Sequence, residues 1–333
     1  MEGVILIIVL VIILCIIVLV IIKSANCYDL TRSSYKNEPF SSKLPPLYIV
    51  YSISNSPYQE WQADLLDFSV AQSGQPGKIV RIVSKDPKYP DRPMPRSRNG
   101  TTLCVDAIED RITLETEDFS KYGGGYSAMN KPGGLRELHK VVTDKSAVIV
   151  LLDPDMIFTR VWDPTALVKE GVVYGQRWHG YGEEYCRKTT PQKYRDYCPP
   201  TDEKAIMYPF AMTMGTLEKI IPKYFESSAY YSTAKDWMTE MSALAIAQND
   251  PSLGLKIITV ANIGITNDWP KHNQDPDAPI MHYCQTIKDK SGKEIWGKRR
   301  YNAWDPVPDP KEATTRVDRE VLEMIRIARA KLK

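Results

Sequence analysis

The sequence lacks an excess of charge of one sign. Its 43 lysines and arginines and 41 acidic residues give a formal net charge of +2, and the two signs are mixed along the chain. Basic clusters such as Lys298-Arg299-Arg300 are short and local. Because nucleic acids are bound through a concentrated basic surface, this distribution argues against a nucleic-acid partner.

Cysteine and histidine are also scarce, with 6 and 4 residues in a chain of 333. No C-x-x-C pair occurs, and no spacing supports a zinc site. Cys186 and Cys198 can close a small disulfide if the domain is lumenal, although a pair of thiols fits the sequence equally well. Asn99 begins a glycosylation sequon that has meaning only under the same assumption. A P-loop is absent too, which disfavours a metal-dependent phosphotransferase or hydrolase.

One long apolar run is present, at residues 4–22. As a helix it would span about 28 Å, close to the hydrocarbon thickness of a bilayer, so we expect a transmembrane signal anchor over residues 1–23. A cleaved signal peptide is the alternative, but Met1-Glu2 lacks the basic residues of such a peptide. We expect a polar, proline-containing stem at residues 24–45 and one α/β domain at residues 46–333. The basic residues follow the run, so the positive-inside rule would place that domain in the cytoplasm.

The most informative segment is Val148-Ile-Val-Leu-Leu-Asp153-Pro-Asp155. Its apolar run predicts a strand covered on both faces, as in the parallel sheet of an α/β domain. Ligands of such sheets bind outside the carboxyl ends of the strands, where two carboxylates suit a divalent cation and a diphosphate. Such triplets also arise by chance. A second one, Asp275-Pro-Asp277, lies in a polar, proline-rich segment that we interpret as an exposed loop.

The pattern around this segment predicts alternating strands and helices. We expect strands at residues 47–53, 78–84, 101–108 and 171–176, and helices at residues 58–73, 134–142, 234–249 and 309–333. The first strand, helix and strand imply a parallel, right-handed crossover. The last helix is expected to open at Asp309, followed by a proline and a capping-box glutamate.

Three further groups are candidates for chemistry. Lys131 lies between two glycine clusters near a helix start, where it would supply a cation for phosphate, although an ordinary flexible connection is the alternative. Asp236 and Glu240 are four residues apart and share a helix face, as ordinary solvated acids also do. His282 lies in a short apolar segment that can return to the sheet edge. Together with Asp153 and Asp155 it would favour Mn²⁺ over Mg²⁺, whereas a merely packed histidine is the alternative.

Six motifs in this order resemble the hydroxyproline O-arabinosyltransferase and peptidyl-serine galactosyltransferase group of plants and green algae, with relatives in large algal viruses. The resemblance covers roughly residues 46–330. The motifs are Ser56-Pro-Tyr-Gln-Glu-Trp-Gln62, Ser73-Gly-Gln-Pro-Gly-Lys-Ile-Val-Arg81-Ile82, Met129-Asn-Lys-Pro132, Leu151-Leu-Asp-Pro-Asp-Met156, Glu240-Met-Ser-Ala-Leu-Ala245 and Met281-His-Tyr-Cys284.

The resemblance implies a glycosyltransferase of the GT-A fold class, with a single Rossmann-like mixed sheet flanked by helices. It further implies a UDP-sugar donor carrying a pentose or hexose, such as arabinose or galactose, and a protein or glycan hydroxyl as acceptor. A type II anchor with the domain in the lumen of the Golgi or endoplasmic reticulum would follow. This placement opposes the one that the positive-inside rule gives.

The resemblance also implies roles for individual residues. The metal motif falls on Asp153 and Asp155, and the late histidine falls on His282. The donor would be bound by Asp153, Lys298 and a group of residues at the first strand and before the helix, which are Tyr51, Ser52, Ser54, Asn130 and Lys131. Glu240 or Asp236 would orient the sugar or the acceptor.

Because negative charge develops on the leaving diphosphate, a cation and a positioned lysine stabilise the transition state directly. The resemblance favours transfer with retention by attack on the same face of the sugar. Double displacement through Glu240 or Asp236 is the alternative mechanism. A catalytically silent, membrane-anchored binding or scaffold protein with the same fold is the alternative function.

Overall fold

The computed structural model describes residues 44–92, 111–177, 186–188, 190–201, 206–231, 239–267 and 277–332. Outside these ranges lie the expected membrane anchor and most of the stem, the Asn99 sequon, the expected strand at residues 101–108, Asp236 and Asp275. Within them, no helix combines the length and the apolar character that crossing a bilayer requires.

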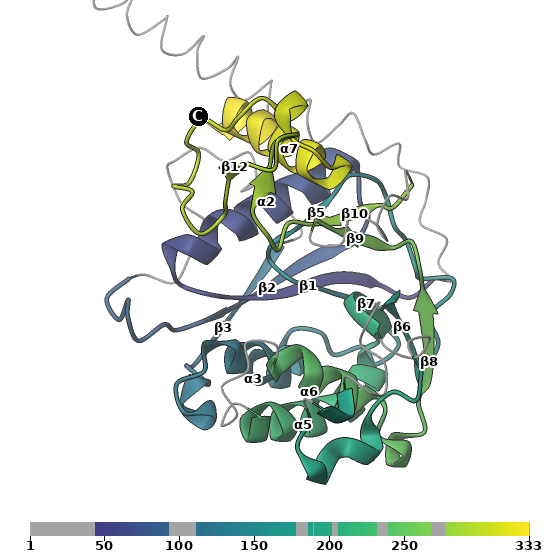
Figure 1. The fold of residues 1–333 in the computed structure, drawn as a ribbon. Coiled ribbons are helices and arrows are strands. Elements are labelled where there is room, and N and C mark those ends of the chain that lie inside the picture. Colours follow the sequence, from purple (N-terminus) through teal and green to yellow (C-terminus); the bar gives the residue numbers. More distant parts are fainter. Residues whose placement is uncertain are drawn as a thin grey trace, which may run out of the picture.

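A seven-stranded mixed sheet forms the centre of the molecule (Figure 1). Its strands are β1 Leu47–Ser54, β2 Lys78–Ser84, β3 Arg111–Thr116, β4 Val148–Leu152, β6 Val172–Arg177, β7 Ile206–Thr213 and β8 Lys256–Val260. Their order is β3-β2-β1-β4-β7-β6-β8. The first four strands are mutually parallel, and β7 runs antiparallel to both β4 and β6. The carboxyl ends of β1, β2 and β4 therefore meet at one edge of the sheet.

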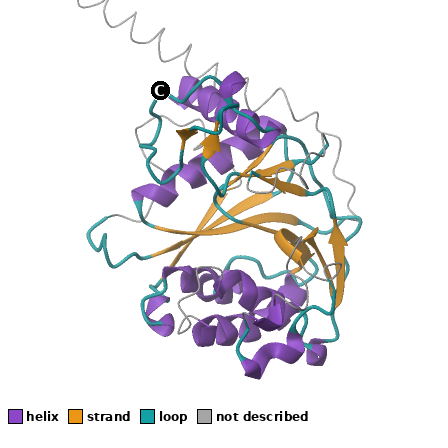
Figure 2. Ribbon diagram, in the orientation of Figure 1, coloured by secondary structure: helices purple, strands orange, loops and turns teal. Residues whose placement is uncertain are grey.

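Helices cover both faces of the sheet (Figures 1 and 2). One face carries α2 Pro57–Ser73 and α7 Arg316–Leu332, and the other carries α3 Asn130–Arg136, α5 Met214–Tyr231 and α6 Thr239–Gln248. Short 3₁₀ helices are η2 Ser120–Gly123, η3 Ser127–Met129, η4 Leu138–Lys140, η5 Gln192–Tyr197, η8 Pro251–Leu253 and η9 Pro310–Glu312. This mixed α/β arrangement fits a Rossmann-like fold, and the predicted fold class is confirmed at that level.

The first strand, helix and strand follow local sequence signals closely. Ser56 is the N-cap of α2, and its hydroxyl accepts a hydrogen bond from the Gln59 amide at 3.3 Å. The helix ends at Gly74, whose φ of 69° lies in the left-handed region that glycine adopts without strain. β1 and β2 then pair in parallel, as predicted. All five residues of β4 are buried, so the prediction of a strand covered on both faces is confirmed as well.

A buried ionic cluster joins α2 to the sheet beneath it. Arg81 on β2 forms ion pairs with Asp64 and Asp67 of α2, at 3.0 Å and 2.6 Å. Arg111 on β3 pairs with Asp67 at 3.3 Å. The Tyr51 hydroxyl donates to Asp67 and accepts from the Arg81 guanidinium at 2.9 Å. Glu60, the third acid of α2, pairs with Arg92. These contacts explain how the central part of α2, residues 60–70, can be buried together with its three acids, because each acid is paired rather than merely desolvated.

The segment after β4 forms a second, small sheet with the late part of the chain. β5 Met156–Phe158 pairs antiparallel with β10 Ile280–His282, and β10 pairs in parallel with β9 Gly264–Thr266. A hairpin of β11 Ile287–Lys288 and β12 Glu294–Trp296 follows. The segment around His282 thus returns to the neighbourhood of the central sheet, but it pairs in the small sheet and not with an edge of the large one.

Two predicted helices have other bounds in the structure. The helix expected at residues 134–142 begins already at Asn130 and ends at Arg136, so Lys131 lies within its first turn. The helix expected from Asp309 is interrupted. Asp309 does cap a turn, but Ala313 is extended and bridges to Asp289, and α7 begins only at Arg316. The pairing of Ala313 with the β11–β12 hairpin competes with helix formation there.

The predicted alternatives for Cys186 and Cys198 are resolved by the fold. The two residues form a disulfide with Cα atoms 5.7 Å apart. Both are buried, and they pack against Ala245 of α6. The bridge therefore closes a loop within the irregular segment between β6 and β7, and this loop packs against the helix that carries Glu240.

Candidate functional site

The candidate site lies where β4 ends and the chain turns into β5. The Met156 amide donates to the Asp153 carbonyl at 3.2 Å, so the two aspartates lie on a tight turn between the strands. In the β5–β10 ladder His282 is the register partner of Met156. The Tyr283 amide also donates to the Asp155 carbonyl at 3.1 Å. Strand pairing, not sequence proximity, brings the histidine beside the acids.

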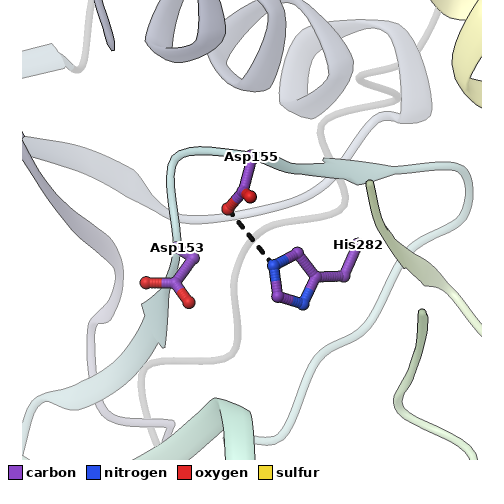
Figure 3. A group of neighbouring side chains, drawn as sticks. All are labelled: Asp153, Asp155 and His282. Atoms are coloured by element: carbon purple, nitrogen blue, oxygen red, sulfur yellow. Dashed lines mark ion pairs between the residues drawn. The ribbon is translucent and has the colours of Figure 1, made fainter. Parts of the chain in front are cut away.

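The side chains of Asp153, Asp155 and His282 converge (Figure 3). Each offers one ligand atom, and these atoms all lie within 4.8 Å of one another. A cation bound at ~2.1–2.4 Å from its ligands separates opposite ligands by roughly 4.2–4.8 Å, so the spacing fits one ion. Two carboxylate oxygens and an imidazole nitrogen suit Mn²⁺ better than Mg²⁺, which prefers oxygen ligands alone.

His282 is oriented by Asp155. Its Nε2 lies 3.3 Å from Asp155 Oδ1. Its Nδ1 is buried and has no hydrogen-bond partner in the described part of the chain. A histidine that served packing alone would be expected to satisfy its buried nitrogens. Burial lowers the pKa of His282, but the neighbouring Asp155 carboxylate outweighs it and the pKa is raised above its ordinary value.

Two lysines reach the aspartates from separate elements. Lys131 of α3 forms an ion pair with Asp153, and Lys298, which follows β12, forms one with Asp155. Both lysine side chains are 12% exposed. Burial alone would raise the pKa of Asp155, but Lys298 and then His282 hold it well below its usual range. Burial likewise opposes the charge on Lys298, and Asp155 raises the pKa of that ammonium above its ordinary value.

Glu240 lies behind Lys131 and is 4% exposed. Its Oε2 accepts from the Lys131 ammonium at 3.0 Å, and its Oε1 accepts from the hydroxyls of Tyr208, at 2.9 Å, and Tyr224. Burial raises the pKa of Glu240 above its usual value, and Lys131 opposes that shift. Every carboxylate oxygen of Glu240 is thus engaged within the protein. This geometry suits a residue that holds Lys131 in place better than one that attacks a substrate.

The tyrosines of this network were not found by sequence reasoning. Tyr208 belongs to β7 and Tyr224 to α5, and no motif or spacing connects either with Glu240. The Lys131 ammonium also lies 4.2 Å from the centroid of the Tyr208 ring, a cation–π contact. Both tyrosines are buried, which raises the pKa of Tyr208 well above its ordinary value and keeps its hydroxyl protonated.

The residues predicted to bind the nucleotide occupy different environments. Ser54 lies half-buried at the carboxyl end of β1, where its hydroxyl contacts Ser56 at 3.0 Å and Asp86 at 3.5 Å. Ser52 faces α3, with its hydroxyl 3.5 Å from the Asn130 carbonyl. The Asn130 side chain accepts from the Phe119 amide at 2.6 Å, which fixes the approach to α3.

The structure places Tyr51 in the interior of the domain, and its predicted contact with a nucleotide stays a prediction. Its side chain is fully buried, and its hydroxyl is bound in the ionic cluster beneath α2 with Asp67 and Arg81. Successive side chains of a strand point to opposite faces, so Tyr51 and its neighbour Ser52 are directed to different sides of the sheet. A nucleotide could contact the Tyr51 ring only if the interior opened.

Sequence reasoning also missed Asn267, which supports the segment that carries His282. Asn267, directly after β9, holds the corner that follows His282. Its side-chain oxygen accepts from the Gln285 amide at 3.0 Å, its amide group donates to the Gln285 carbonyl at 3.1 Å, and it also donates to Asp318 of α7 at 3.0 Å. Its own backbone amide donates to the His282 carbonyl at 3.3 Å. The sequence holds no signal for these contacts, because they join segments far apart in the chain.

The second aspartate triplet is unlike the first. Asp277 is exposed and pairs with the exposed Arg160 at 2.5 Å, and Asp275 lies outside the described residues. The described half of that triplet therefore agrees with the predicted exposed loop.

Comparison with known proteins gives one informative similarity. No protein-family profile matches the chain. A peptidyl serine alpha-galactosyltransferase of Chlamydomonas reinhardtii is 21% identical to it over 131 residues, which are 39% of this chain and 17% of that protein. The similarity thus spans less than a fifth of the relative's length. It supports a glycosyltransferase-like relationship and a function of that general kind.

Proposed function

We propose that the chain is a metal-dependent glycosyltransferase of the GT-A fold class. It would transfer a pentose or hexose, such as arabinose or galactose, from a UDP-sugar to a hydroxyl of a protein or glycan, with retention. The observation that carries this proposal is the meeting of two carboxylates, an imidazole and two lysines at the carboxyl end of β4. The distant galactosyltransferase similarity supports the reaction class.

Asp153, Asp155 and His282 would hold the cation, preferably Mn²⁺, with Mg²⁺ as a possible substitute. When bound, the cation supplies a Lewis acid for the oxygens of the diphosphate. A site of this kind needs an edge where a ligand can enter. We place this entrance at the edge where the ends of β1, β2 and β4 meet, because a nucleotide lying across them would reach the aspartates.

The two lysines would bind the diphosphate. In the proposed step the acceptor hydroxyl oxygen forms a bond to the anomeric carbon while the bond from that carbon to the diphosphate oxygen breaks. The hydroxyl proton passes to the leaving diphosphate. Negative charge grows on that group, and preorganised ammonium groups in a largely buried site stabilise it strongly.

Glu240 would position Lys131 rather than form a covalent intermediate. Its oxygens are bound by Lys131, Tyr208 and Tyr224, so a nucleophilic role would first require these bonds to break. This arrangement favours transfer in one step on a single face of the sugar. Ser52, Ser54 and Asn130 would line the nucleotide side of the pocket. Residues 1–23 would anchor the chain in a Golgi or endoplasmic-reticulum membrane with the domain in the lumen.

A donor screen tests the proposal. UDP release would be measured from a panel of UDP-sugars with Mn²⁺ and with chelator, for the wild type and for Asp155→Asn. We expect Mn²⁺-dependent release that is lost in Asp155→Asn. Asp277→Asn is the matched control, since it removes an exposed acid from the second triplet and should retain wild-type release. Equal release by Asp155→Asn and the wild type would refute the proposed site, and no release from any donor would favour a silent binding protein.

A further inference from the structure

Arg177, the last residue of β6, forms no ion pair with an acid in the part of the chain that the structure describes. Its side chain is partly buried, and its Nε is enclosed and makes no hydrogen bond there. By contrast, Arg81 of β2 and Arg111 of β3 both pair with Asp67. Buried donors are normally satisfied and a guanidinium keeps its charge, so an enclosed arginine without a partner requires an explanation.

Arg177 lies at the edge of the sheet that carries the candidate site. β7 runs antiparallel to both β4 and β6, so β4 and β6 run in the same direction and both end at this edge. The register agrees, since Leu151 of β4 and Gly175 of β6 both lie opposite Phe210 of β7. Asp153 and Arg177 each follow two residues later. Two strand spacings, which amount to about 10 Å, separate them.

The side chain of Arg177 starts on the face of the sheet that carries Tyr208. Residues two apart on a strand point to the same face, so Arg177 shares a face with Gly175. A Cβ on Gly175 would lie 2.9 Å from the Phe210 ring, and the centroid of that ring lies 4.7 Å from the centroid of the Tyr208 ring. Arg177 is therefore directed to the side on which Tyr208 contacts Glu240.

The side chain of Gln176 agrees with this direction. Its oxygen accepts from the backbone amides of Ile263 and Gly264, at 3.1 Å and 2.9 Å. These residues lie at the start of β9, in the small sheet on the side of the central sheet that carries α2 and α7 (Figure 1). Because successive side chains of a strand alternate, Arg177 is directed to the opposite side, which carries α3, α5 and α6.

The proposed substrate would continue toward Arg177. The strand order across this part of the sheet is β2-β1-β4-β7-β6. With the nucleotide across the ends of β1 and β2 and the diphosphate at Asp153, the sugar and then the acceptor would lie over the ends of β7 and β6. The separation of about 10 Å places Arg177 beyond the diphosphate, beside the sugar or the acceptor.

The chemistry of a guanidinium selects the group that it binds there. It has five N–H donors and no acceptor, and its planar fork matches a carboxylate through two parallel hydrogen bonds. Neutral sugar hydroxyls would accept hydrogen bonds but would leave the partly buried charge uncompensated. The diphosphate already has Lys131 and Lys298 in the proposed site, so Arg177 is available for a second anionic group.

From this placement we infer that Arg177 binds a carboxylate of the substrate, carried either by the transferred sugar or by the acceptor beside it. The inference rests on the proposed function and names a chemical class that the proposed function leaves open. The substrate that this site prefers is then acidic, and its carboxylate lies beyond the diphosphate.

Calorimetry on the full chain with Mn²⁺ tests the inference in two arms. The first compares UDP-galacturonate with UDP-galactose, which differ by a carboxylate, and uses UDP as the reference. The second compares two serine peptides that carry a glutamate or a glutamine next to the serine, on the chain saturated with UDP. The variants are Arg177→Met, which keeps the apolar stem, and Arg177→Lys, which keeps the charge. Arg160→Met is the control, because Arg160 is exposed and pairs with Asp277.

In one of the two arms, we expect the wild type to bind the acidic ligand about tenfold more tightly than the neutral one, which is the effect of a charged hydrogen bond. The arm that responds identifies the source of the carboxylate. Arg177→Met should lose the preference, Arg177→Lys should keep part of it, and Arg160→Met should keep all of it. UDP itself should bind Arg177→Met and the wild type equally. The melting temperature of Arg177→Met should fall by less than about 2 °C, because no acid loses a partner.

Three results would overturn the inference. They are equal affinities of the wild type for acidic and neutral ligands in both arms, a preference that survives in Arg177→Met, and a larger fall in the melting temperature of Arg177→Met, which would assign the guanidinium a structural partner. None of these changes the Mn²⁺-dependent binding of UDP. Failure of the proposed function is distinguishable, because the wild type then shows no Mn²⁺-dependent UDP binding, and the inference fails with it.

Discussion

Replacing Glu240 by glutamine should destabilise the protein, because the isosteric amide cannot satisfy the three donors that the carboxylate accepts. Those donors are the Lys131 ammonium at 3.0 Å, the Tyr208 hydroxyl at 2.9 Å and the Tyr224 hydroxyl. If the NH₂ group faces Lys131, two donors oppose each other. If it faces the tyrosines, two buried hydroxyls lose their acceptor. In either orientation of the amide, at least one good hydrogen bond is lost at a position that is 4% exposed in the wild type.

The magnitude follows from the kind of bond that is lost. A hydrogen bond to a charged group contributes about 1.5–3 kcal/mol. Burial raises the pKa of Glu240, so the wild-type carboxylate is itself partly desolvated at a cost, and the neutral amide recovers some of that free energy. We therefore expect a loss of about 2 kcal/mol in the free energy of unfolding, which lowers the melting temperature of a domain of this size by roughly 3 °C.

Calorimetric or fluorescence-monitored thermal unfolding measures this loss. Glu218→Gln is the matched control, since Glu218 pairs with the exposed Lys145 on the surface and its replacement should change stability by less than about 0.5 kcal/mol. A melting temperature of Glu240→Gln within about 1 °C of the control would refute the reasoning that Glu240 is the structural acceptor for Lys131 and the two tyrosines.

Three further predictions concern the ionic cluster beneath α2, the disulfide and the corner after His282. Arg81→Met should lower the free energy of unfolding, measured by urea denaturation, by about 3–5 kcal/mol, because Asp64 and Asp67 remain buried without their main counter-ion. A loss below about 1 kcal/mol would contradict the explanation that the buried acids of α2 are stabilised by pairing. Reduction of the Cys186–Cys198 disulfide should lower the free energy of unfolding by about 3 kcal/mol, because the unfolded chain is no longer restricted by a closed loop between residues 12 positions apart. An unchanged melting temperature under reducing conditions would contradict this expectation. Asn267→Ala should weaken Mn²⁺ binding in the presence of UDP by about tenfold, because the corner after His282 loses its support. Unchanged Mn²⁺ affinity with a lowered melting temperature would restrict Asn267 to a structural role.

Local signals account for the elements that sequence reasoning placed well. β4 was found because five consecutive apolar residues admit no exposed face, and α2 because Ser56 caps its start and Gly74 its end. The same kind of signal misled at the C-terminus. Asp309 and Pro310 do form a capped turn, but the pairing of Ala313 with Asp289 is a long-range contact that the local pattern cannot contain.

The residues of the site also differ in whether a local signal or a long-range contact determines their position. Asp153 and Asp155 could be placed because they follow a recognisable strand. The approach of His282 was expected from its short apolar segment and from a resemblance whose late histidine falls on it. The burial of the Tyr51 side chain beneath α2 could not be predicted, because β1 is buried on both faces and its pattern does not show which face each side chain takes. Tyr208, Tyr224 and Asn267 could not be found at all, since their roles arise from contacts between β7, α5, α6 and the β9–β10 region that only the fold creates.

Calorimetric titration of the full chain with UDP, with and without Mn²⁺, for the wild type and Asp155→Asn tests the proposed metal and diphosphate site most directly. We expect UDP to bind the wild type tightly only when Mn²⁺ is present, and we expect Asp155→Asn to abolish this dependence while the protein stays folded. UDP binding that is indifferent to Mn²⁺, or that survives unchanged in Asp155→Asn, would contradict the claim that Asp153, Asp155 and His282 form a metal and diphosphate site.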